Sequence, residues 1–383
     1  MALDEDPPGS DAPAHRVSDG GVTANAKTEQ NSIAGAESVA AYERRVREKV
    51  LVVLGVTALL GVLAVYATLS GPIDLSVSTV ASVLAGTQGG TPARVVWNIR
   101  LPRIAAAIGG GLGLAVAGAV LQSLLRNPLA SPYTLGISQA AAFGAAVAIV
   151  VLGAGSSTTD SVADWIPYLT GVSAFLAALL STGAILVVAR LRRATPETLV
   201  LTGIALGAFF TAGTSALEYF ATNVQLAALV AWKFGTVSNT TWDENLLLWA
   251  VSLLACAYFV RRAWAYEVLD AGDDTARSLG VEVTRLRVSG MIVASMLTAV
   301  VVSLFGVIGF VGLVVPHIVR RVIGGDERFL IVASSVAGGT LLLASDIFAR
   351  AIIAPIVLPV GIVTAFVGVP LFLYLIINGR EYW

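Results

Sequence analysis

The sequence predicts an all-α protein that crosses a membrane about ten times, with its N and C termini on the inner side. Hydrophobic residues make up 56% of the 383 residues. Charged residues make up 13%, against roughly 25% in soluble domains, which is too few to cover a water-facing surface. The net charge of −1 gives no general attraction to nucleic acid. The single cysteine excludes a disulfide-built domain.

The first segment in the chain differs from the rest. Residues 1–43 are rich in Asp, Glu, Gly, Ser and Ala and hold few apolar residues. Such a segment buries too little apolar surface to offset the entropy of ordering it. We therefore expect a disordered acidic tail over residues 1–43 and a transmembrane domain over residues 44–383. The acidic start and the late first apolar run argue against a signal peptide.

Long apolar runs follow one another through the rest of the chain. A bilayer core of about 30 Å needs about 20 helical residues. The runs that qualify are 50–70, 104–125, 133–153, 167–189, 198–221, 245–262, 288–306, 330–349 and 359–378. A shorter run at 312–323 is either a tenth crossing or a buried or re-entrant helix.

Positive charges favour the ten-crossing alternative, because Lys and Arg gather on the inner side of membrane proteins. With ten crossings and the basic cluster at 44–49 inside, seventeen Lys and Arg residues lie on the inner side and five on the outer side. If 312–323 did not cross, Arg320, Arg321, Arg328 and Arg380 would all move outside. Within the second run, Gly109, Gly113 and Ala117 lie four apart and predict close helix packing.

The sequence carries little that could perform bond chemistry. It contains no G-x-x-x-x-G-K-[ST], H-E-x-x-H or G-x-S-x-G string, and its histidines are His15 and His317. Acids in the runs are few, and Glu218 and Asp346 both lie near outer ends. Proton-driven carriers normally hold ionisable groups near mid-membrane. The pattern thus favours a permease powered by a separate ATPase over a stand-alone secondary carrier or channel, and over a membrane enzyme.

The first candidate site consists of arginines on the outer side, where the charge bias of membrane proteins makes Lys and Arg rare. Arg100 and Arg103 flank Pro102 at the outer start of the second run, and Arg350 lies at the outer end of the run at 330–349. Guanidinium groups there could grip carboxylates of an external partner, or anchor to lipid headgroups. Asp346, four residues before Arg350, could also neutralise it.

The inner connection at 126–132 is the second candidate site. Pro128 and Pro132 are incompatible with a continuous helix, so the chain must turn sharply there. Asn127 and Leu129 could constrict a pathway at this inner mouth. The alternative is an ordinary tight turn.

The longest inner connection, 263–287, is the third candidate site. Thr275 to Leu279 can form a short helix, with Asp273 and Asp274 at its start and Gly280 past its end. Such a helix facing the cytosol could bind in a complementary cleft of an ATPase. The alternative is a solvated surface loop.

Taken in order along the chain, the sequences at these three sites resemble the FecCD/BtuC family of ABC importer permeases. The resemblance extends from about residue 50 to residue 378. The strings that carry the resemblance are Arg-Leu-Pro-Arg at 100–103, Asn-Pro-Leu-Ala-Ser-Pro at 127–132, Ala-Arg-Ser-Leu-Gly-Val at 276–281, Gly-Phe-Val-Gly-Leu at 309–313, Pro-His-Ile-Val-Arg at 316–320, Leu-Pro-Val-Gly-Ile-Val-Thr at 358–364 and Gly-Val-Pro at 368–370. One departure is Val357, where the family usually has Glu. The resemblance makes His317 a structural signature and not a metal ligand.

The resemblance implies a ten-helix permease in the cell (inner or cytoplasmic) membrane that pairs with a second copy of itself. It implies two ATP-binding subunits inside, so that the chain itself needs no cofactor, and a substrate-binding protein outside. The implied cargo is a bulky metal chelate: vitamin B12, a ferric siderophore or haem. It assigns binding-protein docking to Arg100, Arg103 and Arg350, and the inner gate to Asn127 and Leu129. It assigns ATPase coupling to the following residues: Asp270, Thr275, Ala276, Arg277, Leu279 and Gly280.

Overall fold

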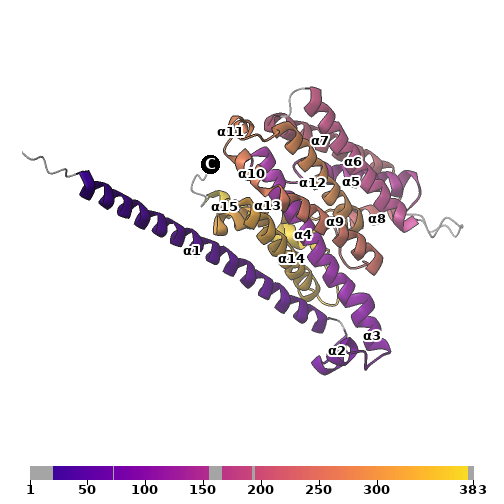
Figure 1. The fold of residues 1–383 in the computed structure, drawn as a ribbon. Helices are drawn as coiled ribbons and strands as arrows, with labels where there is room; N and C mark the ends of the chain where they lie inside the picture. Colours follow the sequence, from indigo (N-terminus) through magenta and orange to yellow (C-terminus); the bar gives the residue numbers. More distant parts are fainter. Residues whose placement is uncertain (1–19, 72, 155–165, 192–194, 378–383) are drawn as a thin grey trace, which may run out of the picture. The chain divides into compact units, whose positions relative to one another are not determined.

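The computed structural model describes residues 20–71, 73–154, 166–191 and 195–377, and all regular secondary structure in these residues is helical (Figure 1). The helices are α1 (Gly20–Leu69), α2 (Val77–Leu84), α3 (Thr91–Val95), α4 (Leu101–Leu125), α5 (Ile137–Ala146), α6 (Ile166–Leu191), α7 (Pro196–Phe220), α8 (Asn223–Lys233), α9 (Trp242–Arg261), α10 (Ala263–Asp270), α11 (Asp273–Ser278), α12 (Val283–Phe305), α13 (Val311–Ile323), α14 (Glu327–Ala351) and α15 (Val360–Ile377). Two π-helical turns, Val96–Arg100 and Val147–Val151, continue α3 into α4 and extend α5.

The chain divides into two units, Met1–Val50 and Leu51–Trp383. In the first unit, helix α1 begins at Gly20, whereas the composition predicts disorder up to residue 43. Residues 20–43 contain six alanines and three glutamates, which have high helix propensity even where there is no apolar face to bury. Residues 1–19 lie outside the described residues, and the domain boundary at 43/44 stays a prediction.

Within the part of the chain that the structure describes, seven helices are long and apolar enough to cross a membrane. They are Tyr42–Leu69, Thr91–Leu125, Tyr168–Leu191, Pro196–Phe220, Trp242–Arg261, Val283–Phe305 and Glu327–Ala351. Each coincides with one predicted run, so the chain is a multi-pass membrane protein whose described secondary structure is all helical. The predicted runs at 133–153 and 359–378 match the shorter apolar helices Ile137–Val151 and Val360–Leu375.

The count of ten crossings and the side of the termini stay predictions. Helix α13 has 13 residues, about 20 Å at 1.5 Å per residue, which is shorter than the hydrocarbon core.

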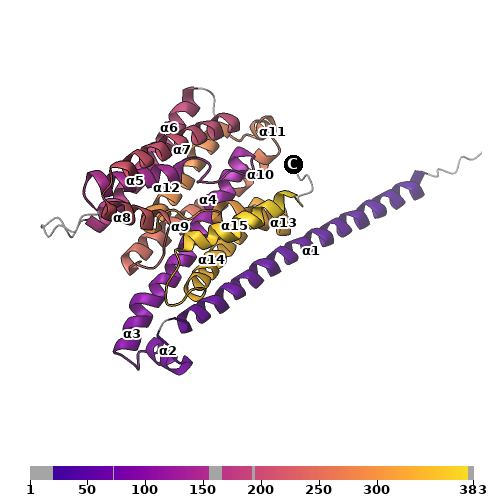
Figure 2. The ribbon, with the colours of Figure 1, turned by 180° about the vertical axis from the view of Figure 1, so that it is seen from behind.

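Helix α4 lies at the centre of the second unit. Both views place it between α9 and α12 on one side and α13 and α14 on the other (Figures 1 and 2). Its residues from Gly109 to Leu125 are all buried. No charged residue occurs between Arg103 and Arg126. This is expected, because burying an unpaired charge costs a large free energy.

Glycines allow the backbones of α4, α13 and α14 to touch. A Cβ on Gly118 would overlap the carbonyl oxygen of Gly312, and one on Gly111 would overlap that of Gly338. The small residues predicted from spacing, Gly109 and Gly113, instead face side chains of α9 and α12. Small residues at helix crossings are the means by which helices pack closely in lipid.

We expect Gly118→Ala to lower the melting temperature of the detergent-purified protein, because its new methyl group would force α4 and α13 apart. Overpacking of this kind costs about 1–3 kcal/mol. The matched control is Gly183→Ala in α6, where a Cβ meets nothing within 4 Å. There alanine should be neutral, or stabilising by up to about 1 kcal/mol. Equal melting temperatures for the two variants would contradict the packing described.

Candidate functional site

Two groups of charged side chains in the second unit lie at the two ends of α4. The N-terminal end holds Arg100 and Arg103 with Asp346 and Arg350 from the end of α14. The C-terminal end holds a larger set from the starts of α11, α12 and α14 and the end of α13. Arg100 and Arg103 lie on the predicted outer side and residues 126–132 on the predicted inner side, so the two ends of α4 correspond to those two sides.

Arg100 is 5% exposed, and its side chain binds the end of α1. Its guanidinium donates to the carbonyl oxygens of Thr68 (2.6 Å) and Leu69 (2.9 Å), and also to that of Ile73. These carbonyls have no partner within a helix, because they lie at or past its last turn. Arg100 therefore joins the first and second long helices. Its predicted part in docking is not tested by this arrangement.

Arg103 and Arg350 share the buried carboxylate of Asp346. Arg103 binds it through Nε (3.0 Å to Oδ1) and Nη2 (2.8 Å to Oδ1), while Arg350 Nε lies 3.2 Å from Oδ2. Arg350 Nη1 donates to the Ser70 carbonyl oxygen at 3.2 Å. Its Nη2 is buried and has no hydrogen-bond partner in the described part of the chain. Asp346 thus contacts two arginines, and their two positive charges exceed its single negative charge.

At the other end of α4, the chain turns sharply, as the prolines predict. Arg126 adopts a left-handed conformation (φ 43°, ψ 43°). The N–H groups of Arg126 and Asn127 donate to the carbonyl oxygens of Ser123 (3.2 Å) and Gln122 (3.0 Å), which is the Schellman pattern of a helix C-terminus.

The side chain of Asn127 shapes the next residues of this turn. Its Oδ1 accepts a hydrogen bond from the Leu129 N–H at 2.9 Å, and Leu129 is 46% exposed. We call residues 126–132 the gate turn. The gate role of Asn127 and Leu129 stays a prediction.

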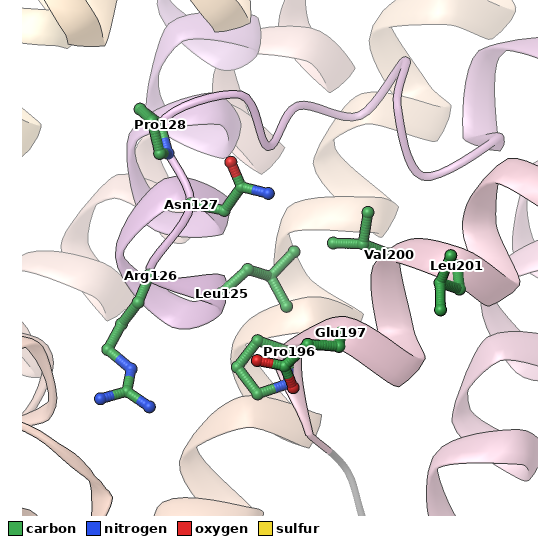
Figure 3. A pocket seen from close by; sticks show the side chains of 8 residues that line it. All are labelled: Leu125, Arg126, Asn127, Pro128, Pro196, Glu197, Val200 and Leu201. Carbon is green, nitrogen blue, oxygen red and sulfur yellow. The ribbon is translucent and has the colours of Figure 1, made fainter.

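A hollow of about 520 Å³ separates the gate turn from the start of α7 (Figure 3). In Figure 3 the Asn127 amide points into the space toward Val200, and Arg126 points away from it. The other lining residues are Leu125, Pro128, Pro196, Glu197 and Leu201. The hollow is thus lined mostly by apolar residues, with Arg126, Asn127 and Glu197 as its polar ones.

The third predicted site forms a short exposed helix. Helix α11 runs from Asp273 to Ser278, two residues N-terminal to the predicted start at Thr275. Ala276 is buried, whereas Thr275, Arg277 and Leu279 are exposed, and Gly280 has a φ of 84°. We call α11 the coupling helix.

Asp270, the last residue of α10, faces the end of α13. Its Oδ2 lies 3.4 Å from Arg320 Nη1. Burial raises the pKa of Asp270, and the charge of Arg320 opposes that rise. The pair therefore joins the segment before the coupling helix to α13.

Asp273 lies at the centre of the inner charges. Arg287 of α12 binds both of its oxygens, Nη2 to Oδ1 at 2.7 Å and Nη1 to Oδ2 at 2.8 Å. Arg126 Nη2 lies 3.3 Å from Oδ1, and Arg277 Nη2 lies 3.6 Å from Oδ2. Burial alone would raise the pKa of Asp273, but the hydrogen bonds and charges of these arginines outweigh it and hold that pKa below its usual value.

A second buried group joins α4, α13 and α14. The side chain of Glu327 is fully buried, and its Oε1 accepts from Ser123 Oγ (2.7 Å) and Arg320 Nη2 (2.9 Å). Sequence reasoning missed Glu327 and the connecting role of Asp273. The sequence feature that could have indicated Glu327 is its position as an acid in the first turn of an apolar helix. Among the described residues, no group of three or more His, Cys, Asp or Glu could hold a metal ion.

We expect Asp346→Asn to destabilise the protein by on the order of 3 kcal/mol, because removing one member of a buried ion pair leaves its partners desolvated. The control is Glu218→Gln, which breaks the more exposed Glu218–Lys233 pair (2.8 Å) and should cost about 0–1 kcal/mol. Thermal unfolding in detergent measures both. A larger loss for Glu218→Gln would show that Asp346 is not the counter-ion that stabilises this end.

Comparison with known proteins places the chain among transport permeases. The FecCD transport family matches residues 59–378. A Methanocaldococcus jannaschii protein named as an ABC transporter permease is 48% identical over 340 residues, covering 88% of this chain and 97% of that protein.

Two further relatives are named for particular cargoes. The hemin transport system permease HmuU of Yersinia pestis is 35% identical over 324 residues (84% of this chain and 94% of that protein). The vitamin B12 import system permease BtuC of Vibrio cholerae is 36% identical over 288 residues (75% and 84%).

Among solved structures, one described as an inward-facing metal-chelate type ABC transporter superposes with a TM-score of 0.74. It is 30% identical in sequence and covers 85% of this chain and 98% of that one. The fold and the sequence thus lead to the same family.

Proposed function

Because the chain belongs to the FecCD transport family, we propose that it is the membrane-spanning subunit of an ATP-driven importer that carries a bulky metal chelate into the cytoplasm. In this proposal it pairs with a second copy of itself in the cell membrane. Two ATP-binding subunits attach to the inner side, and a substrate-binding protein delivers cargo on the outer side. The chain crosses the membrane ten times, with both termini inside.

The observation that carries this proposal is the exposed coupling helix in a chain whose sequence has no P-loop. Helix α11 presents Thr275, Arg277 and Leu279 outward from one turn. A hollow of about 460 Å³ adjoins it, lined by residues 280–285 and Arg277. An exposed leucine beside a hollow suits a protein partner, since apolar anchors filling pockets dominate interface energies. We assign this surface to the ATP-binding subunit.

The opposite end of α4 suits an acidic partner. Arg103 and Arg350 keep 13% and 12% of their side-chain surface exposed, and Asp346 holds both in place. Carboxylates of a binding protein would add the counter-charge that this cluster lacks. Arg100 supports the cluster by joining the end of α1 to the start of α4.

Cargo identity is a separate question from mechanism. Relatives are named for hemin and for vitamin B12, which are both large metal-centred macrocycles. We propose a bulky metal chelate as the cargo, either a macrocycle of this kind or a ferric siderophore. The apolar helices hold few polar groups that would select one chelate, so selection falls mainly to the binding protein.

Reconstitution tests the function directly. We expect proteoliposomes that contain the permease and its ATP-binding subunits to take up cobalamin, hemin or a ferric siderophore only when ATP and the binding protein are supplied. Uptake by the permease alone would instead support the alternative function, a stand-alone secondary carrier or channel. An ATP-dependent signal that persists with a catalytically inactive ATP-binding subunit would also contradict the proposal.

The coupling surface gives a sharper prediction. We expect Leu279→Glu to reduce co-purification of the ATP-binding subunit by about tenfold, since a desolvated carboxylate at an apolar contact costs more than about 1.4 kcal/mol. Leu279→Met is the matched control because it conserves volume and apolarity. Affinity pull-down from detergent, with permease folding checked by gel filtration, measures both. Equal recovery of the subunit with the two variants would remove Leu279 from the interface.

A further inference from the structure

We propose that Asp273 is the positioning residue that joins the coupling helix to the gate turn, so that movement of α11 reaches Asn127 and Leu129 through its ion pairs with Arg287 and Arg126. This inference rests on the proposed function and adds to it the contacts that transmit the motion.

The first connection runs through Arg287. Its side chain is 4% exposed, and its two terminal nitrogens hold the two oxygens of Asp273 at 2.7 and 2.8 Å. Its Nε donates to the carbonyl oxygen of Leu124 at 3.2 Å, in the last turn of α4. One buried guanidinium therefore binds both the first residue of the coupling helix and the end of the helix that leads into the gate turn. Planar, forked contacts of this kind fix orientation as well as distance.

The second connection runs through Arg126. Its side chain reaches Asp273 Oδ1 at 3.3 Å, and its backbone adopts the left-handed conformation that ends α4. That position usually holds glycine, and a residue with a Cβ pays about 1–2 kcal/mol there. The ion pair offsets part of this cost. A shift of the Asp273 carboxylate would thus act on the backbone of Arg126, whose next residue is Asn127, and Asn127 in turn fixes Leu129.

Besides these ion pairs, the coupling helix is held by one fully buried side chain. It contains six residues, of which Ala276 is the one buried, and so short a helix is unstable in isolation. Its neighbours in space are α10 and α12. Ala276 packs into the hydrophobic core of the second unit, and the ion pairs from Asp273 add a directional attachment, as a transmitting contact must be.

Asp273→Asn tests the inference, because it keeps the shape of the side chain and removes its charge. In the reconstituted complex we expect ATP hydrolysis to stay within about twofold of wild type, while cargo moved per ATP hydrolysed falls by about fivefold or more, the lower end of typical coupling energies. Asp273→Glu, which keeps the charge, should give a value of cargo moved per ATP between those of Asp273→Asn and wild type. The matched control is Asp274→Asn, which changes the next acid on the same helix, fully exposed and paired with Arg277 at 2.9 Å. It should leave the ratio unchanged.

A double-mutant cycle isolates the route through Arg126. Arg126→Gln should lower the same ratio, and combining it with Asp273→Asn should cost little more than either change alone. Additive losses would overturn the transmitting role of the Asp273–Arg126 pair. Equal losses of hydrolysis and uptake in Asp273→Asn would overturn the inference too, and so would an unchanged ratio. Failure of the proposed function itself would look different, because the wild-type complex would show no ATP-dependent uptake.

A measurement on the permease alone covers the case in which Asp273→Asn does not assemble with its ATP-binding subunits. Spin labels at Thr275→Cys and Leu129→Cys, in a Cys256→Ser background, report the distance between the coupling helix and the gate turn. We expect Asp273→Asn to broaden that distance distribution and Asp274→Asn to leave it narrow. The same width in all three proteins would overturn the inference.

Discussion

The structure depends on one constraint: α4 is buried without interruption from Gly109 to Leu125, so charged groups contact it at its two ends. Between Arg103 and Arg126 it carries no ionisable residue, and glycines bring its backbone against α13 and α14. A helix packed so closely has little freedom to deform within its length. Forces on this part of the protein must therefore act through the polar groups at the ends.

Those two ends are built differently. At one end, Asp346 neutralises two arginines and leaves positive charge in excess. At the other, Asp273 gathers three arginines from α4, α11 and α12. Buried or partly buried charge pairs are weak sources of net stability, because desolvation cancels much of their attraction. Their value here lies in holding separate helices in a fixed relation, which is what docking surfaces and transmitting contacts need.

Much of this could be predicted from the sequence. Apolar runs located every long helix, because the length needed to cross a bilayer is a local property. The prolines at 128 and 132 predicted the sharp turn, and the Asp–Asp start with Gly280 beyond the end predicted α11 to within two residues. Pairings such as Arg103–Asp346, 243 positions apart, could not be predicted, since they depend on which helices meet. For the same reason spacing indicated Gly109 and Gly113, while the backbones meet at Gly111 and Gly118.

The central claim is that the motion of this permease is powered by a different polypeptide. The most direct measurement is the distance between spin labels at Leu129→Cys in the two copies of the proposed dimer after reconstitution, in a Cys256→Ser background, with and without trapped nucleotide. The account predicts that this distance changes on nucleotide trapping when the ATP-binding subunits are present, and stays constant when they are absent. A distance that changed with nucleotide in the permease alone, or that never changed in the full complex, would contradict it.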